Sequence, residues 1–225
     1  MSIWNDIRRR GIGADVKQEN DLSIEFDGAL NYTKESKEDI RNTIRNLHIS
    51  PVIFPLRAST IIGKSVLISA ERKTYQVLFK ERFPEDKDDD WDELASVRVL
   101  GEYKRHEKKI ILYIDNIKEI KHHYGDLLPM MRYVYLHELM HAFFDRNPEH
   151  NYIYEIEEAF AEFGALICLN ELVSKDKADS FELEWAWSLV YSKKDVLPCY
   201  SNGYNLFNLY KEKQDLAKTM LESYL

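Results

Sequence analysis

One apolar segment, LLPMMRYVYLHELMHAFFD at residues 127–145, constrains the fold more than any other part of the chain. Its apolar residues recur three and four positions apart, and no glycine or proline follows Pro129. The segment is therefore predicted to form a helix that is buried over most of its surface. Two histidines lie within it, and neutral imidazoles in such a place need polar partners.

His137 and His141 are four residues apart, and Glu138 lies between them. Residues at this spacing share one helix face, with about 5–6 Å between their Cβ atoms, so both imidazoles can bind one metal ion. Glu138 is close enough to reach a water molecule on that metal without being a ligand. This is the chemistry of the HExxH motif, which supplies two zinc ligands and a general base from one helical turn. The alternative is a chance match in an ordinary core helix.

A catalytic zinc site needs a third protein ligand and an open position for water. The metzincin pattern, in which a glycine and a third histidine follow the motif, is absent here. Residues 142–150 contain no glycine, and His150 lies nine positions after His141 rather than six.

The segment EIEEAFAEFGALICL at residues 155–169 offers glutamates in place of the third histidine. Glu158 and Glu162 share a helix face among small and apolar residues, where a carboxylate is costly to bury unless it binds a metal or is paired. These two are therefore predicted to be functional. Glu155 and Glu157 are predicted to face solvent.

HELMH followed by IEEAFAEFG resembles the gluzincin group of zinc metallopeptidases, typified by thermolysin, in a minimal single-domain form. In that group the HExxH helix is followed by a helix with the pattern E-x-x-x-D. The resemblance implies that Glu158 completes a Zn²⁺ site with His137 and His141, and that Glu138 is the general base. Glu162 stands where the family has aspartate, and it would hydrogen-bond a ligand histidine from outside the coordination sphere.

The activity that this resemblance implies is hydrolysis of peptide bonds in a peptide or protein substrate. Glu138 would assist attack by a zinc-bound water and pass the proton to the leaving amine. The residue that donates a hydrogen bond to the oxyanion is not assigned by the sequence. The candidates are His150, Tyr152, Tyr154, Tyr200 and Tyr204. The alternative function is a zincin-fold regulatory or binding module with an intact metal site and narrow or no proteolytic activity. The presence of Glu138 favours catalysis, because a purely structural site needs ligands only.

The whole chain, residues 1–225, is predicted to form one α+β domain. It has a strand-rich part (1–126) and a helical part (127–225). Runs of β-branched and aromatic residues predict the strands, and apolar residues at helical spacing predict the helices. Predicted helices lie at 36–47, 153–173, 181–191 and 205–223, and predicted strands at 51–56, 65–70, 74–80, 96–103 and 108–115, the last two as a hairpin. By the resemblance the fold is zincin-like, and strand 108–115 is the edge strand over the active-site helix that pairs with extended substrate.

The net charge and the hydropathy of the chain limit the kinds of molecule that it is expected to bind. A net charge of −8 argues against a nucleic-acid-binding protein. No run approaches 18 apolar residues, and the first residues lack the apolar centre of a secretory signal, so a soluble, cytoplasmic protein with no membrane partner is expected. Cys168 lies in an apolar run and is predicted to be a buried free thiol.

Overall fold

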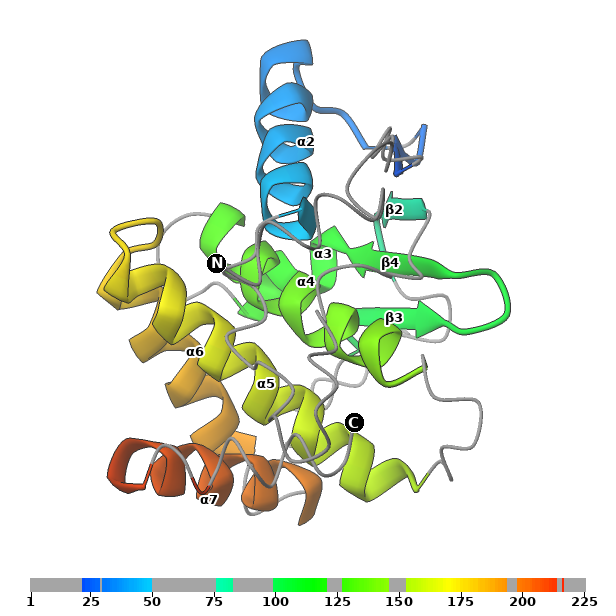
Figure 1. Cartoon of the computed structure of the whole chain (residues 1–225). Coiled ribbons are helices and arrows are strands. Elements are labelled where there is room, and N and C mark those ends of the chain that lie inside the picture. Colours follow the sequence, from blue (N-terminus) through cyan, green and yellow to red (C-terminus); the bar gives the residue numbers. More distant parts are fainter. Residues whose placement is uncertain are drawn as a thin grey trace, which may run out of the picture.

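The computed structural model describes residues 22–28, 30–49, 76–82, 99–120, 127–145, 153–193, 198–213 and 216, and it shows an α+β architecture (Figure 1). The described strands are β1 (Ser23–Phe26), β2 (Gln76–Lys80), β3 (Gly101–Lys104) and β4 (Lys109–Tyr113). The described helices are α2 (Lys34–Ile49), α3 (Ile114–Ile120), α4 (Leu127–Phe144), α5 (Tyr154–Ser174), α6 (Ser180–Lys193) and α7 (Pro198–Glu212). The strands predicted at 51–56 and 65–70 lie outside the described residues.

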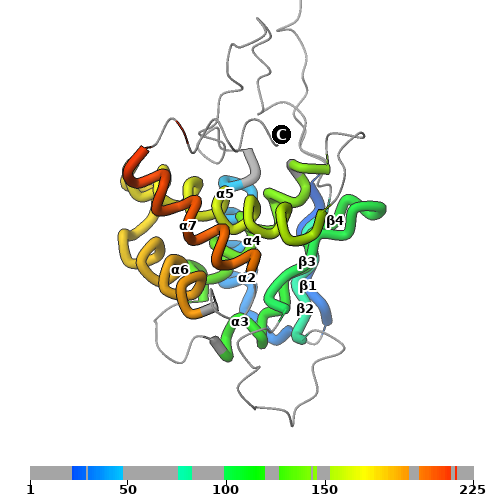
Figure 2. Tube along the Cα trace, turned by 90° about the horizontal axis from the view of Figure 1, so that it is seen from below, coloured from blue at the N-terminus to red at the C-terminus, as the bar shows by residue number. Residues whose placement is uncertain are grey.

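Helix α4 is the central element of the fold. It contacts β3 and β4 of the sheet and also α2, α3, α5 and α6. Figure 2 shows the sheet on one side of α4 and helices α5, α6 and α7 on the other. The buried side chains of these elements form one connected apolar core. The prediction of a largely buried helix at 127–145 is confirmed.

The sheet is small and mixed, with strand order β1-β2-β4-β3. Strands β1, β2 and β4 are parallel, and β3 pairs antiparallel with β4. The predicted hairpin is therefore confirmed, and Lys108 in its turn adopts a positive φ of 52°. The prediction that 108–115 is the edge strand is wrong, because β4 lies between β2 and β3. Among the described strands it is β3 that forms the edge beside α4.

Three later helices agree with their predicted positions to different degrees. Helices α5 and α6 match the predictions at 153–173 and 181–191 within a few residues. Helix α7 begins at Pro198, seven residues before the predicted start at 205. Proline is well tolerated in the first turn of a helix, where its missing N–H group would have no intrahelical partner.

Two described elements were not predicted. Strand β1 has only four residues, SIEF, and it is a strand because it pairs with β2. Helix α3 follows β4 without a loop and is too short, at seven residues, to show a clear period. Within the described ranges, no helix combines the length and apolar character needed to cross a membrane.

Candidate metal centre

Helix α4 brings His137, Glu138 and His141 to its side facing α5 and the hairpin of β3 and β4. The two imidazole rings are 4.9 Å apart between centroids and nearly perpendicular, at 71°. Helix α5 packs closely against α4 because small residues lie at the contact. A Cβ atom at Gly164 would come within 2.5 Å of Cε of Met140. This close approach carries the glutamates of α5 to the histidines.

Three side chains converge between the two helices, and Glu158 offers a different carboxylate oxygen to each histidine. Nε2 of His137 lies 3.2 Å from Nε2 of His141 and 3.3 Å from Oε2 of Glu158. Nε2 of His141 lies 3.3 Å from Oε1 of Glu158. We call His137, His141 and Glu158 the triad. It is the one group of at least three histidine, cysteine or acidic residues in the described part of the chain whose donor atoms lie within 4.8 Å of one another.

Each of these pair distances matches the spacing of two ligand atoms on a tetrahedral zinc ion. Bonds of about 2.0–2.1 Å at the tetrahedral angle place neighbouring ligand atoms about 3.3 Å apart. Two imidazole nitrogens and one carboxylate oxygen are also a donor set of the kind that zinc binds at catalytic sites. Without a proton or a metal ion between them, the lone pairs of these nitrogen and oxygen atoms would repel one another.

The other ring nitrogen of His141 is held by a glutamate of α5. Nδ1 of His141 lies 2.8 Å from Oε1 of Glu157, and the Glu157 side chain is fully buried. The prediction that Glu157 faces solvent is therefore wrong, whereas Glu155 is exposed as predicted. A carboxylate at Nδ1 keeps the proton on that nitrogen and leaves the lone pair of Nε2 for a metal.

Nδ1 of His137 has a carboxylate neighbour as well. Oε1 of Glu162 lies 3.5 Å away, which is an ion-pair contact too long for a hydrogen bond. The other oxygen of Glu162 accepts a hydrogen bond from the hydroxyl of Tyr133, one turn before His137 on α4. Glu162 is 4% exposed. Each imidazole of the triad thus has a carboxylate of α5 on its far side.

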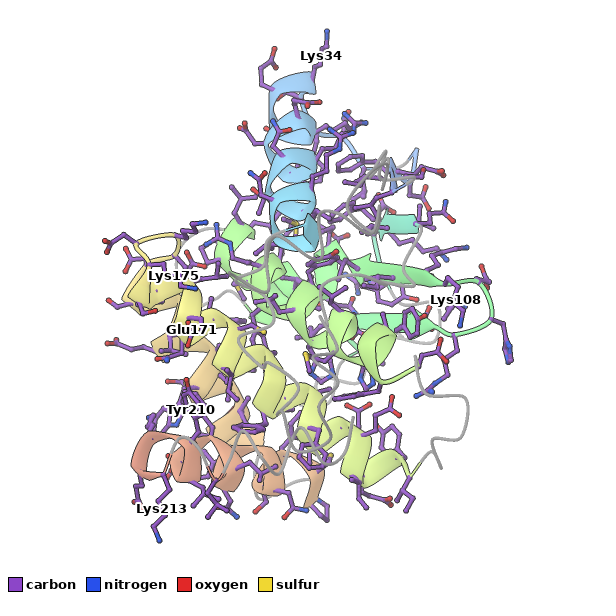
Figure 3. All side chains as sticks on the ribbon, viewed as in Figure 1. Lys34, Lys108, Glu171, Lys175, Tyr210 and Lys213 are labelled. Carbon is purple, nitrogen blue, oxygen red and sulfur yellow. The ribbon has the colours of Figure 1, made fainter. Side chains whose placement is uncertain are left out.

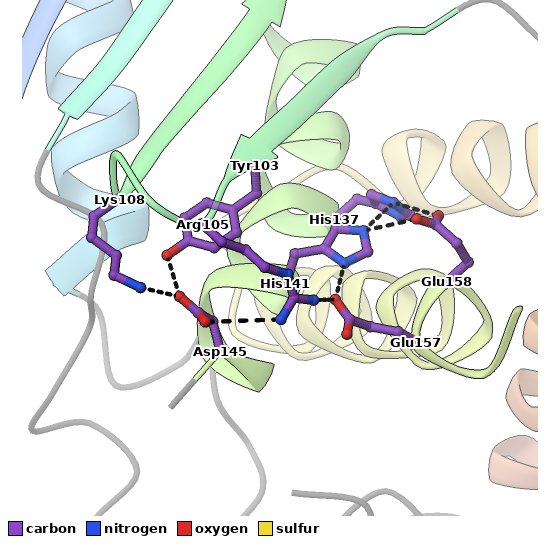
Figure 4. A network of polar contacts seen from close by, with 8 residues as sticks. All are labelled: Tyr103, Arg105, Lys108, His137, His141, Asp145, Glu157 and Glu158. Atoms are coloured by element: carbon purple, nitrogen blue, oxygen red, sulfur yellow. Dashed lines mark hydrogen bonds and ion pairs between the residues drawn. The ribbon is translucent and has the colours of Figure 1, made fainter. Parts of the chain in front are cut away.

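A network of charged groups extends from Glu157 to the surface (Figure 4). Arg105, in the turn of the hairpin, donates to Glu157 and lies 3.8 Å from Asp145. Asp145, at the end of α4, accepts a hydrogen bond of 3.0 Å from the hydroxyl of Tyr103 and pairs with Lys108. Lys108 lies at the outer end of the hairpin (Figure 3). These contacts fix the hairpin against α4 and α5.

Glu138 lies at the wall of a pocket beside the triad. The pocket has a volume of about 180 Å³ and is lined by residues of β3, α4 and α5, among them Gly101, Tyr103 and Glu158. Glu138 is 5% exposed. Burial raises the pKa of Glu138 to about 7, although the charges of His137 and His141 act in the opposite direction. A carboxylate with this pKa is suited to accept and return a proton near neutral pH.

Of the five candidate oxyanion donors, Tyr154, Tyr200 and Tyr204 lie among the described residues, and Tyr200, at the start of α7, senses the carboxylates of Glu162 and Glu158. Burial and the charges of Glu162 and Glu158 raise the pKa of Tyr200 well above its usual value, so its hydroxyl stays protonated. Tyr204 packs against Trp187 and Tyr191, with ring centroids 5.6 and 5.4 Å away. Tyr154 is 52% exposed. His150 and Tyr152 lie outside the described residues.

Cys168 and Cys199 are both buried free thiols, as predicted for Cys168.

Comparison of the chain with protein-family models, with curated proteins and with solved structures returns no match.

Proposed function

We propose that this protein is a zinc-dependent metallopeptidase with a zincin-like fold. The observation that carries the proposal is the convergence of the triad. Its two Nε2 atoms are 3.2 Å apart, each lies 3.3 Å from a different oxygen of Glu158, and the buried carboxylate of Glu138 lies beside them. The resemblance of HELMH and IEEAFAEFG to gluzincins supports the same assignment.

The triad residues would hold Zn²⁺, which when bound lowers the pKa of a water ligand toward neutrality and polarises a carbonyl oxygen. Glu138 takes a proton from the attacking water and delivers it to the leaving amine nitrogen as the C–N bond breaks. Glu157 and Glu162 keep the two imidazoles in the tautomer that points Nε2 at the metal. The hydroxyl of Tyr200 donates to the oxygen on which negative charge develops.

The edge strand β3 is suited to bind an extended peptide. In an antiparallel pair, alternate residues hydrogen-bond to the partner strand, and the residues between them direct their N–H and C=O groups the other way. Tyr113 donates its N–H to the carbonyl of Leu100 over 3.0 Å, so Leu100 belongs to the bonded set. Gly101 and Tyr103 therefore direct their backbone groups away from β4. A substrate strand added there would pass over the pocket that holds Glu138.

The burial of Glu138 favours a peptidase over a binding module that only retains the metal site. A buried carboxylate is costly, and a site that only binds metal does not need one beside its three ligands. The test compares the wild type with Glu138→Gln for zinc content and for cleavage of a peptide library. We expect about one zinc per chain in both proteins, and cleavage by the wild type alone.

Three other results of the comparison between the wild type and Glu138→Gln would each count against part of the proposal. Equal cleavage by both would refute the catalytic role of Glu138. Zinc in both without cleavage by either would support the regulatory or binding module. Less than about half an equivalent of zinc in the wild type after expression with ample metal would refute the metal site itself.

A further inference from the structure

Gly101, the first residue of β3, lies directly against the side chain of Glu138. A Cβ atom at Gly101 would come 2.9 Å from both Cγ and Oε1 of Glu138 and 2.9 Å from Cγ1 of Val134. Real Cβ atoms essentially never approach other heavy atoms so closely. Any side chain at position 101 would therefore force one of these neighbours, or the strand, to move.

The strand is not free to move away. Gly101 is paired with Leu112 of β4, which is completely buried. Two residues further along β3, the hydroxyl of Tyr103 binds Asp145 at the end of α4 over 3.0 Å. The hairpin is thus attached both to the sheet and to the helix that carries Glu138.

The two neighbours on α4 differ in how they can respond. Val134 is 3% exposed, lies within the core and has a short, stiff side chain. Glu138 has a longer side chain, and its carboxylate borders the pocket. Rotation of Glu138 into the pocket is therefore the easier way to relieve the contact.

We propose that Gly101 is a positioning residue, whose missing side chain leaves the space in which the Glu138 carboxylate is held beside the triad. The inference rests on the proposed function, since it assigns to Gly101 the placement of the general base. The Cβ positions of the other described glycines do not lie against Glu138. Gly28 has nothing within 4 Å, Gly164 faces the flexible end of Met140, and Gly203 lies against Cβ of Glu162.

The experiment uses Gly101→Ala, with Gly28→Ala as the matched control. For each variant we would measure zinc content and the midpoint of thermal unfolding. We would also determine the crystal structure, and kcat and KM for a cleaved peptide. In Gly101→Ala we expect the Glu138 carboxylate to be displaced in the crystal structure while zinc content is unchanged. Because displacement of a reacting group by about 1 Å can cost about 100-fold, kcat should fall by roughly that factor with little change in KM. Gly28→Ala should behave as the wild type.

The double variant Gly101→Ala with Val134→Ala separates placement of the base from packing. Val134→Ala removes the Cγ1 atom that the added Cβ would meet, so the two changes should lower the unfolding midpoint by less together than the sum of their separate effects, with Val134→Ala alone measuring the cost of the space left in the core. It should not restore kcat, because the contact with Glu138 remains. An undisplaced carboxylate in Gly101→Ala, or recovery of kcat in the double variant, would overturn the inference and leave the proposed function standing. Equal activity of the wild type and Glu138→Gln would refute the proposed function, and the crystal structures would then still decide whether Gly101 places the carboxylate.

Discussion

Glu157 lies 2.8 Å from Nδ1 of His141, and its side chain is fully buried at the start of α5. The adjacent residue, Glu158, faces the Nε2 atoms of the same pair of histidines. Two consecutive glutamates of one helix thus contact opposite sides of one imidazole. One belongs to the triad, and the other holds the ring in place.

Replacement of Glu157 by alanine is expected to weaken zinc binding without removing a ligand. Loss of a carboxylate behind a ligand histidine typically reduces metal affinity by about 10–100-fold, because the ring loses its orientation and its tautomer preference. Competition with a chromophoric chelator measures the affinity. Glu155→Ala, at an exposed position in the first turn of the same helix, is the control. Unchanged affinity in Glu157→Ala would contradict the role of Glu157.

Removal of the metal is expected to make stability depend on pH in a defined window. Burial lowers the pKa of His141, but hydrogen bonds to Glu157 and Glu158 outweigh it and raise the pKa from 6.5 to about 9. A pKa raised by folding contributes stability that is present below about pH 6.5 and is lost as the pH rises toward 9. Burial raises the pKa of Glu158, but its hydrogen bonds to His137 and His141 lower it far below 4.5. That contribution is present above about pH 4.5 and is lost as the pH falls.

Thermal unfolding of the protein after treatment with a chelator tests this pattern. Glu138, with its pKa raised to about 7, also loses stability as the pH rises above about 4.5. We therefore expect the highest midpoint between about pH 4.5 and 6.5, toward the lower end of that window, and a much smaller decline above pH 6.5 once zinc is restored. Zinc affinity should rise over the same upper range, because the metal displaces protons from the histidines. His106→Asn, a change at an exposed position in the hairpin turn, should leave the profile unaltered. A midpoint of the metal-free protein that rises from pH 6.5 to 9 would be inconsistent with the assignment.

Replacement of Tyr200 by phenylalanine is expected to lower kcat while zinc content and folding are retained. Loss of one donor to a developing oxyanion costs about 10²–10³-fold in kcat. Tyr204→Phe is the matched control, since Tyr204 packs in an aromatic cluster with Trp187 and Tyr191. Steady-state kinetics on a cleaved peptide give the comparison. If Tyr204→Phe lowers kcat and Tyr200→Phe does not, the oxyanion donor has been assigned to the wrong residue.

The ion pair of Arg132 and Glu182 is expected to stabilise the packing of α4 against α6. Nη1 of Arg132 lies 2.7 Å from both oxygens of Glu182, and the two side chains are 17% and 7% exposed. Glu182→Gln removes a nearly buried charge and should lower the free energy of unfolding by about 1–3 kcal/mol. Glu38→Gln disrupts exposed pairs at 3.6 and 3.7 Å and should cost less than about 1 kcal/mol. Urea unfolding measures both, and equal effects would contradict the difference in burial.

The local sequence pattern was sufficient to predict the residues of the site that lie on one helix. His137, Glu138 and His141 are placed relative to one another by the geometry of a helical turn, which does not depend on the rest of the chain. The positions of α4, α5 and α6 followed from periodicity for the same reason. Strand β1 and helix α3 escaped prediction because they are too short for a period to show.

Tertiary structure decided what depends on partners far away in the chain. Four glutamates lie within eight residues at the start of α5, and the rotation of that helix against α4 determines that Glu157 is buried and Glu155 exposed. The order of the strands likewise results from pairing between distant segments, so β3 rather than β4 lies at the edge. The space at Gly101 exists only because that edge strand crosses Glu138. The sequence by itself determined which side chains a single helix can offer to a metal ion. The packing of α5 and β3 against that helix decided which groups complete the site, because burial and close contact are set between elements and not within them.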